Sequence, residues 1–312
     1  EDRSPAEISS WQRTRRVNCF DISHSGGIGV HAEGEMICCW DELRDAGISS
    51  IARAHLLDTY TLKIFPSNKV ILSGGADFSL RVWSLDHLAA ADPHRIKGIS
   101  KYAVQMTGHS GGILSTDFVG AGKNIVSSSM DGMVKFWDVS VQQCLLSFGE
   151  LSRVHVHSCV VDKNSVWAAS DGGTLRQYDL SSGDMICEAP KIGCSVNCVR
   201  ILNDQYRIAG TGEGTLQLYD VRKMDVVLDK YKSSEISVLD IESHSGEENT
   251  QSNSFFVGTG DNKLEEYCIS DGNIREAKKY VLPKEHEPVT AVRQRLNFLY
   301  SLTGDYIAKQ NV

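Results

Sequence analysis

One arrangement of four side chains occurs twice and limits the possible folds more than any other feature of the chain. A His is followed by Ser, Asp and Trp at offsets of 18, 22 and 28 residues, first as His55, Ser73, Asp77 and Trp83 and again as His109, Ser127, Asp131 and Trp137. An Asp in a tight turn can accept a hydrogen bond from His, the His can reach the Ser hydroxyl, and the hydroxyl can accept from the indole N–H. Such groups are buried at low cost only when they are paired. This order of residues is typical of one blade of a β-propeller.

The turn and the aromatic anchor of this blade recur along the whole chain. Turn positions fall at Gly34, Asp77, Asp131, Gly172, Glu213, Asp261 and Asp305. Six residues after each of them stand Trp40, Trp83, Trp137, Tyr178, Tyr219, Tyr267 and Asn311. The turns are 43, 54, 41, 41, 48 and 44 residues apart, and repeats of about 40–45 residues are typical of blades with four strands. We therefore predict an all-β, seven-bladed β-propeller that forms a single domain over residues 1–312.

The two ends of the chain are predicted to meet in the last blade. The seventh repeat stops at Val312, directly after its third strand, which leaves an unpaired sheet edge. Residues 1–16 are expected to be a lead-in and the missing outer strand, with residues 7–12 pairing with 306–310. Trp11 is then either an anchor of this closure or an exposed tail residue. The two longest spacings predict insertions near residues 86–93 and 242–249, so Asp240 and Glu242 are interpreted as the start of a solvated loop.

Composition restricts the class of partner and the compartment. The formal charge of −8 argues against a nucleic-acid surface and favours a basic partner. No apolar run approaches the roughly 18 residues that span a membrane. Nine scattered cysteines are expected to be reduced, which indicates the cytoplasm, the nucleus or both. Because the chain starts at Glu1 rather than Met, we expect a fragment, and a targeting segment upstream stays possible.

Three patterns hint at chemistry, and each has a simpler interpretation. Gly108–Gly112 matches G-x-S-x-G with Ser110 as nucleophile, but a β-prone run follows where a hydrolase needs a helix. Gly120–Lys123 lacks the first Gly and the Ser or Thr of a phosphate-binding loop. His155, His157 and Cys159 alternate on one strand face as zinc ligands would, with only the isolated Cys194 and Cys198 to complete a site. We predict no catalytic residue, no cofactor and no metal.

A partner is instead expected on the rim formed by the Asp turns and the Gly-His loops, because loops vary while the blades stay rigid. The side chains predicted there are Glu33, Asp58, Ser110, Met130, His155 and Asp171. Three of the six are acidic and none is Lys or Arg, which suits a basic partner.

Two levels of family resemblance follow from these residues. The His55 and His109 repeats, with Leu72–Asp77, Arg81–Trp83 and Phe136–Asp138, resemble the WD-repeat family over nearly the whole chain. Longer stretches are similar to the proteasomal ATPase-associated factor family: Val17–Ser23, Gly26–Val30, Val70–Gly75, Gly108–Leu114, Ala209–Thr211 and Leu218–Arg222. Blades four to seven depart from the pattern, since Glu150, Lys191, Leu239 and Pro283 stand where the His would be.

The closer resemblance implies a non-enzymatic chaperone for proteasome assembly. Such a protein binds the C-terminal region of an ATPase subunit of the proteasome regulatory particle and limits its docking, and it is expected to be monomeric outside its complex. The alternatives are a generic WD-repeat scaffold, a ubiquitin-ligase substrate adaptor, and a hydrolase that uses Ser110. The family's separate N-terminal segment is absent from the sequence.

Overall fold

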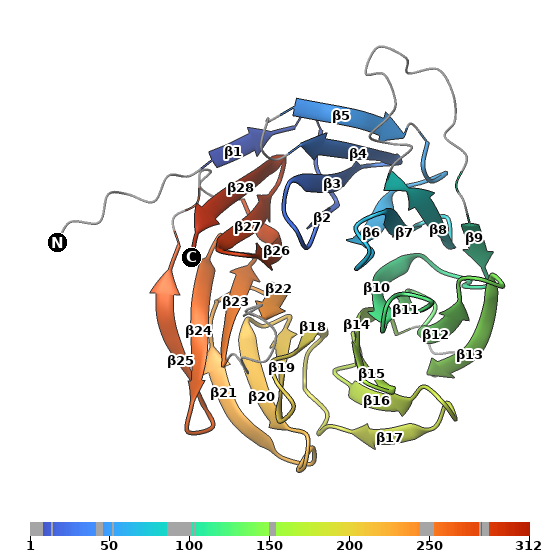
Figure 1. Ribbon diagram of the computed structural model, residues 1–312. Coiled ribbons are helices and arrows are strands. Elements are labelled where there is room, and N and C mark those ends of the chain that lie inside the picture. The colour runs from blue at the N-terminus through green and yellow to red at the C-terminus, as the bar shows by residue number, and fades with distance from the viewer. Residues whose placement is uncertain are drawn as a thin grey trace. The chain divides into compact units, whose positions relative to one another are not determined.

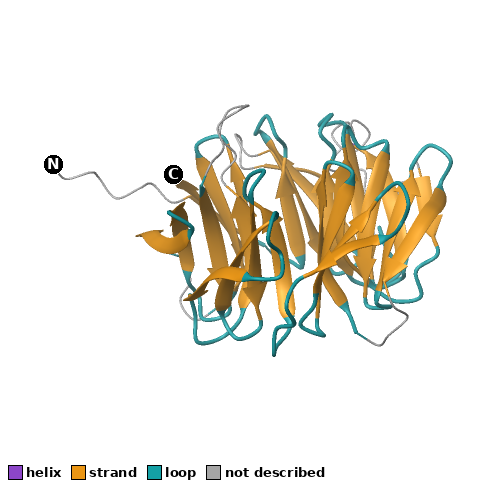
Figure 2. Cartoon of the chain, turned by 90° about the horizontal axis from the view of Figure 1, so that it is seen from below, coloured by secondary structure: helices purple, strands orange, loops and turns teal. Residues whose placement is uncertain are grey.

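A computed structural model describes residues 9–13, 15–41, 46–51, 53–85, 102, 104–149, 154–243, 253–280, 282 and 287–312; the side chains of 9–12 and 46–49 lie outside this description. The described residues form 28 strands in seven four-stranded sheets (Figures 1 and 2). The prediction of an all-β, seven-bladed β-propeller is confirmed, and each sheet is one blade. In the described part of the chain, no helix is long and apolar enough to cross a membrane.

The chain divides into two compact units, Asn18–Val199 and Glu1–Val17 with Arg200–Val312. The organisation as one domain over residues 1–312 stays a prediction. In six of the seven sheets the four strands are neighbours in chain order, and in the seventh the N-terminal strand lies beside the last strand of the chain.

Blades 1 to 4 lie in the first of these units. Blade 1 consists of β2 (Cys19–Ile22), β3 (Ile28–Glu33), β4 (Met36–Asp41) and β5 (Ala46–Ile51). Blade 2 consists of β6 (Thr59–Ile64), β7 (Val70–Gly75), β8 (Ser79–Ser84) and β9 (Val104–Thr107). Blade 3 consists of β10 (Ile113–Val119), β11 (Asn124–Ser129), β12 (Met133–Asp138) and β13 (Gln143–Gly149). Blade 4 consists of β14 (Val156–Asp162), β15 (Ser165–Ser170), β16 (Leu175–Asp179) and β17 (Met185–Glu188).

The remaining strands form blades 5 to 7. Blade 5 consists of β18 (Val196–Ile201), β19 (Tyr206–Thr211), β20 (Thr215–Asp220) and β21 (Val227–Lys232). Blade 6 consists of β22 (Val238–Ser243), β23 (Ser254–Thr259), β24 (Leu264–Ser270) and β25 (Asn273–Lys279). Blade 7 consists of β26 (Val289–Arg295), β27 (Phe298–Thr303), β28 (Tyr306–Asn311) and the N-terminal β1 (Ser9–Gln12).

The N-terminal strand completes the last blade, as predicted. β1 pairs antiparallel with β28, with Ser9 opposite Lys309 and Gln12 opposite Tyr306. The backbone N–H of Arg13 extends the pairing by donating to the carbonyl of Asp305 at 2.8 Å. This pairing covers a sheet edge that would otherwise be open to other chains. The side chain of Trp11 lies outside the described residues, and its role as an anchor stays a prediction.

The position of a strand within its blade decides how much of it is buried. In the second strands β7, β11 and β23, five of six residues are buried, whereas the fourth strands β13 and β25 are mostly exposed. A second strand is hydrogen-bonded to a strand of its own blade on either side, and another blade packs against each of its two faces. Small and apolar residues therefore occupy both faces of the strand. This explains runs such as the one in β11 that show no strict alternation of polar and apolar residues.

Buried or half-buried aspartates on the first strands join neighbouring blades within each unit. The carboxylate of Asp21 accepts a hydrogen bond from the N–H of Ile64 at 2.8 Å, and that of Asp117 accepts from Val161 at 2.7 Å. Asp240 accepts in the same way from Val292 at 3.1 Å. Their partners lie 43 to 52 residues away, so sequence analysis offered no signal for these contacts.

The interpretation of Asp240 and Glu242 as the start of a solvated loop is wrong. Asp240 is buried on β22, and its two oxygens accept from Arg200 at 2.9 Å and from Arg293 at 2.8 Å. Arg295 donates to Glu242 at 3.0 Å. The first strand of this blade continues through both carboxylates, and arginines of other first strands neutralise them, as buried charges require.

Candidate partner-binding surface

The four residues of the first repeat meet in blade 2 as one buried chain of hydrogen bonds. His55 Nδ1 lies 2.8 Å from Asp77 Oδ1, and His55 Nε2 lies 2.8 Å from the hydroxyl of Ser73. The indole N–H of Trp83 donates to the same hydroxyl at 2.9 Å. The chain runs from the loop before β6, through the Asp turn, to the third strand β8. It therefore holds the loop, the turn and the strand of blade 2 in a fixed arrangement.

Blade 3 repeats the chain. His109 lies 2.8 Å from both Asp131 and Ser127, and the indole of Trp137 donates to Ser127 at 2.8 Å. Burial opposes ionisation of Asp131, but hydrogen bonds from His109 and from the N–H of Ser110 outweigh it and lower the pKa of Asp131 to about 2. In the same way, the pKa of Asp77 lies well below its usual range, because its bonds with His55 and the N–H of Leu56 outweigh the effect of burial. Both carboxylates therefore stay charged and hold their histidines at neutral pH.

Blades without this chain pair their buried aromatic anchors differently. In blade 5 the hydroxyl of Tyr219 donates to Gln217 at 2.8 Å. In blade 6 the hydroxyl of Tyr267 lies 2.5 Å from Glu265, and burial together with this carboxylate raises the pKa of Tyr267 above its usual value. The anchors at 178, 219 and 267 were found from the sequence as aromatic residues at the right offset. The polar partners of these anchors were not found from the sequence. Each partner stands two residues before its anchor, and not at the position that Ser73 and Ser127 occupy in blades 2 and 3.

The predicted acidic rim is wrong at Glu33. The Glu33 side chain is buried, and its carboxylate lies 3.1 Å from His31 Nε2. β3 continues to Glu33, so this residue lies on the blade face that carries His31 two positions earlier, and not in the turn.

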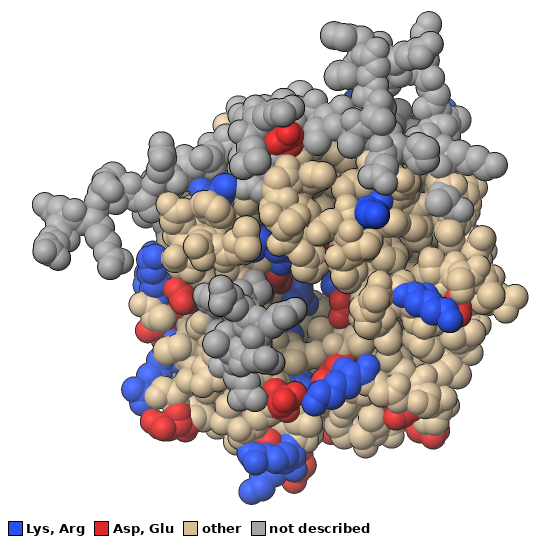
Figure 3. Space-filling model, in the orientation of Figure 1, with Lys and Arg blue, Asp and Glu red and all other residues tan. Residues whose placement is uncertain are grey.

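The carboxylate of Asp171 is exposed but is shared by two histidines. His157 Nε2 lies 2.5 Å and His155 Nδ1 lies 3.2 Å from its oxygens. The predicted rim residues His155 and Asp171 are thus brought together in blade 4, where both imidazoles lie against the carboxylate of Asp171. Among the described residues, Asp58 is the one predicted acidic rim residue that is exposed and makes no contact with a histidine. On the face drawn in Figure 3, basic and acidic side chains are intermixed over a largely uncharged surface.

Three exposed apolar side chains on blade 2 were missed by sequence analysis. Leu56 is 80%, Leu57 56% and Phe78 44% exposed, and we call these three residues the blade 2 patch. The N–H of Leu56 donates to Asp77 at 2.9 Å, so the loop of Leu56 and the turn of Phe78 meet at that carboxylate. Of the other predicted rim residues, Asp58 and Ser110 are exposed and Met130 is half-buried.

Phe78 occupies a backbone conformation that every other blade gives to Gly or Asn. Its φ is 64°, in the turn between the second and third strands. The residues with positive φ in the corresponding turns are Gly34, Gly132, Gly173, Gly214, Asn262 and Gly304. A side chain makes this conformation unfavourable, so an aromatic residue there is a departure from what local structure prefers. The only available signal was the Asp-Phe pair at 77–78 where the next blade has Asp-Gly.

The chemical alternatives find little support in the described residues. Ser110 is followed by the strand β10, and both ring nitrogens of the neighbouring His109 are engaged with Asp131 and Ser127. Cys159 is buried, and burial raises the pKa of its thiol to about 11. His155 and His157 face Asp171 instead of that thiol. Gly122 has a φ of 90°, and Gly120–Lys123 forms the turn between β10 and β11 of blade 3.

Comparison with known proteins gives partial matches. The family model of the WD domain, G-beta repeat, matches residues 48–84 and 100–138. Human WD repeat-containing protein 18 is 26% identical over 251 residues, which is 70% of this chain and 56% of that protein. The Dictyostelium discoideum WD repeat-containing protein 55 homolog is 22% identical over 185 residues, which is 59% of this chain and 43% of that protein. The chain thus spans about half the length of these curated relatives.

A solved structure matches over nearly the whole chain. The structure of U3-55K superimposes with a TM-score of 0.83 and covers 98% of both chains at 13% sequence identity. At this identity the likeness concerns the fold alone. The two relatives and this structure are not named as proteasome assembly factors.

Proposed function

We propose that this seven-bladed WD40-repeat β-propeller is a non-enzymatic scaffold that binds another protein through the blade 2 patch. The observation that carries the proposal is Phe78, an exposed aromatic residue held at a φ of 64°. Backbone strain of this kind costs on the order of 1–3 kcal/mol and is concentrated at functional sites. A turn that needs only to connect two strands would have Gly here, as in blades 1, 3, 4, 5 and 7.

The surroundings of Phe78 favour a protein partner. Clustered exposed apolar side chains mark interaction surfaces, and aromatic residues dominate the energetics of such interfaces. The buried chain of His55, Ser73, Asp77 and Trp83 fixes the loop and the turn that present the patch, which lowers the entropy lost on binding. Asp58 lies exposed two residues from Leu56. We therefore propose an apolar segment with a basic residue beside it as the feature of the partner that is recognised.

Narrower functions are distinguished by the identity of that partner. The closer family resemblance favours the C-terminal region of an ATPase subunit of the proteasome regulatory particle, which would make the protein an assembly chaperone. A ubiquitin-ligase substrate adaptor would instead associate with ligase subunits. A general scaffold function has more support than either narrower function. The relatives described above are named as WD repeat-containing proteins, and their names do not mention the proteasome. We propose location in the cytoplasm, the nucleus or both, from the nine free cysteines.

Replacing Phe78 with Gly should abolish partner capture and leave the fold intact. The substitution removes the aromatic anchor and also relieves the backbone strain, so the melting temperature should stay the same or rise. Affinity capture from cell extract followed by mass spectrometry measures the partners, and thermal denaturation measures stability. Leu145→Ser is the matched control, because Leu145 is an exposed apolar residue on the fourth strand of blade 3.

The outcomes separate the hypotheses. Capture of ATPase subunits by the wild-type protein and by Leu145→Ser, with loss in Phe78→Gly, supports the chaperone function, and ligase subunits support the adaptor. The partner should bind the wild-type protein directly when both are purified, with at least tenfold weaker affinity for Phe78→Gly. Equal affinity for the two would show that the blade 2 patch is not the binding surface.

A further inference from the structure

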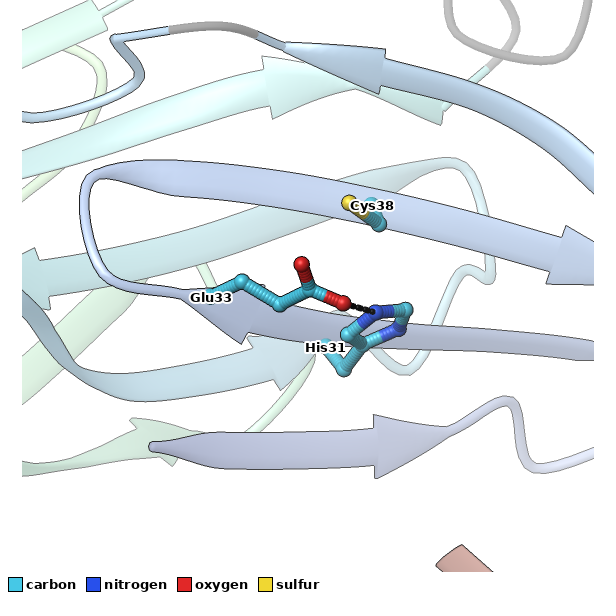
Figure 4. Close-up of side chains that lie close together, drawn as sticks. All are labelled: His31, Glu33 and Cys38. Atoms are coloured by element: carbon cyan, nitrogen blue, oxygen red, sulfur yellow. Dashed lines mark hydrogen bonds and ion pairs between the residues drawn. The ribbon is translucent and has the colours of Figure 1, made fainter. Parts of the chain in front are cut away.

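A second group of reactive side chains lies in blade 1, and the proposed scaffold function does not use it. His31 and Glu33 lie on β3 and Cys38 lies on the neighbouring strand β4 (Figure 4). A nitrogen, an oxygen and a sulfur atom from these residues all lie within 4.8 Å of one another. His31 Nε2 lies 3.1 Å from Glu33 Oε1.

The pairing of two strands brings the three side chains together. His31 and Glu33 are two positions apart, so their side chains are on the same face of the strand. Cys38 lies directly opposite His31 in the antiparallel register, which brings its side chain to that face as well. Gly34, with a φ of 62°, makes the tight turn between β3 and β4 that sets this register.

Comparison with blade 2 shows that this group occupies the place of the buried hydrogen-bond chain. In blade 2, Trp83 pairs with Ile71, which lies two residues before Ser73. In blade 1, Trp40 pairs with Gly29, which lies two residues before His31. His31 therefore takes the position of the Ser, and its ring lies 5.1 Å from that of Trp40. Cys38 takes the position of Arg81, which pairs with Ser73. Blade 1 thus has an imidazole, a carboxylate and a thiol where blade 2 has a hydroxyl and a guanidinium.

The chemistry of these donors is that of a zinc site. His nitrogen, Cys sulfur and carboxylate oxygen are the three ligand types of Zn²⁺, whereas Ca²⁺ and Mg²⁺ prefer oxygen alone. The carboxylate of Glu33 and the thiolate of Cys38 would each carry one negative charge, which together balance the two positive charges of Zn²⁺. Cys38 is half-buried, which leaves a route for the ion from solvent.

We propose that His31 Nε2, a carboxylate oxygen of Glu33 and Cys38 Sγ bind one Zn²⁺ ion, with a fourth position open to water or to a ligand atom from a partner. The ion would join β3 to β4 in blade 1. The sequence carries no signal for this site, because its three residues follow no known ligand spacing. The site is distinct from the His155, His157 and Cys159 pattern of blade 4.

Cobalt substitution tests the proposal directly. The purified protein, stripped of metal with a chelator, is titrated with Co²⁺, and its absorption spectrum reports a thiolate-to-cobalt charge-transfer band. We expect one equivalent to bind, Zn²⁺ to displace it, and Cys38→Ser and Glu33→Gln to weaken binding by about tenfold or more. Cys144→Ser is the matched control, because Cys144 is an exposed free cysteine outside the group. Circular dichroism establishes that each variant is folded.

A measurement on the wild-type protein makes the test independent of folding of the variants. Zn²⁺ should slow alkylation of Cys38 by iodoacetamide by about tenfold or more and leave alkylation of Cys144 unchanged, as read by mass spectrometry of the labelled peptides. A charge-transfer band that persists in Cys38→Ser, or Cys38 alkylation that Zn²⁺ does not slow, would overturn the proposal.

Discussion

Replacing Trp137 with Ala should lower the free energy of unfolding by about 3–5 kcal/mol. Trp137 is 1% exposed and lies on the third strand of blade 3. Its ring packs in a cluster that includes Leu72 and Leu80 of blade 2 and Ile113 and Ile125 of blade 3. The substitution leaves a large cavity in this cluster and also removes the indole N–H that donates to Ser127.

Chemical denaturation followed by circular dichroism measures this effect. Trp137→Phe is the matched variant: it keeps an aromatic ring and loses the N–H, so we expect a smaller loss of about 1–3 kcal/mol. Leu145→Ala, at an exposed position, should change the free energy of unfolding by no more than about 0.5 kcal/mol. A Trp137→Ala protein that is as stable as the wild type, and loses only partner binding, would contradict a structural role for this residue.

Replacing Asp131 with Ala should lower the free energy of unfolding by about 1–3 kcal/mol at neutral pH. The substitution leaves the buried His109 without its carboxylate and removes the acceptor for the N–H of Ser110. The loss should depend on pH, because the pKa of Asp131 is lowered to about 2 in the folded protein and is about 3.9 in an unfolded chain. A depressed pKa stabilises the folded state above the unfolded pKa. That stabilisation disappears as the pH falls through the folded pKa.

The difference in stability between the wild type and Asp131→Ala should therefore be constant above about pH 5 and shrink towards about pH 2. Unfolding curves at a series of pH values measure this difference directly. Asp58→Ala is the control, because Asp58 is an exposed aspartate directly before β6 of blade 2 and is not one of the eight residues of the two buried chains. A difference that stays constant from pH 7 to pH 2 would mean that the carboxylate stabilises the blade only through packing.

The seven blades could be predicted from the sequence because their signals are local and repeated. The residues at 40, 83, 137, 178, 219 and 267 are buried aromatic anchors on the third strands, as their spacing indicated. The closing of blade 7 by β1 followed from one missing strand and one surplus segment. The first inference depends on hairpins within a blade, where chain neighbours become spatial neighbours. The second joins the two ends of the chain and depends on the open sheet edge that a missing strand would leave.

The candidate sites depended on contacts that the spacing does not encode. Glu33 resembled an exposed turn residue, but β3 extends through it and turns its carboxylate towards His31. Phe78 resembled an ordinary residue of an Asp turn, and only its positive φ and its exposure beside Leu56 single it out.

The sequence by itself determined the class of fold, the number of blades and the eight residues of the two buried chains, because each rests on hydrogen bonding and turn formation within one repeat of about 40–55 residues. Outside these two chains, tertiary structure alone decided which polar side chains are buried. Asp240 binds arginines of two other blades. The physical reason is that burial of a side chain is set by the strand or blade packed against it, which lies far away in the sequence.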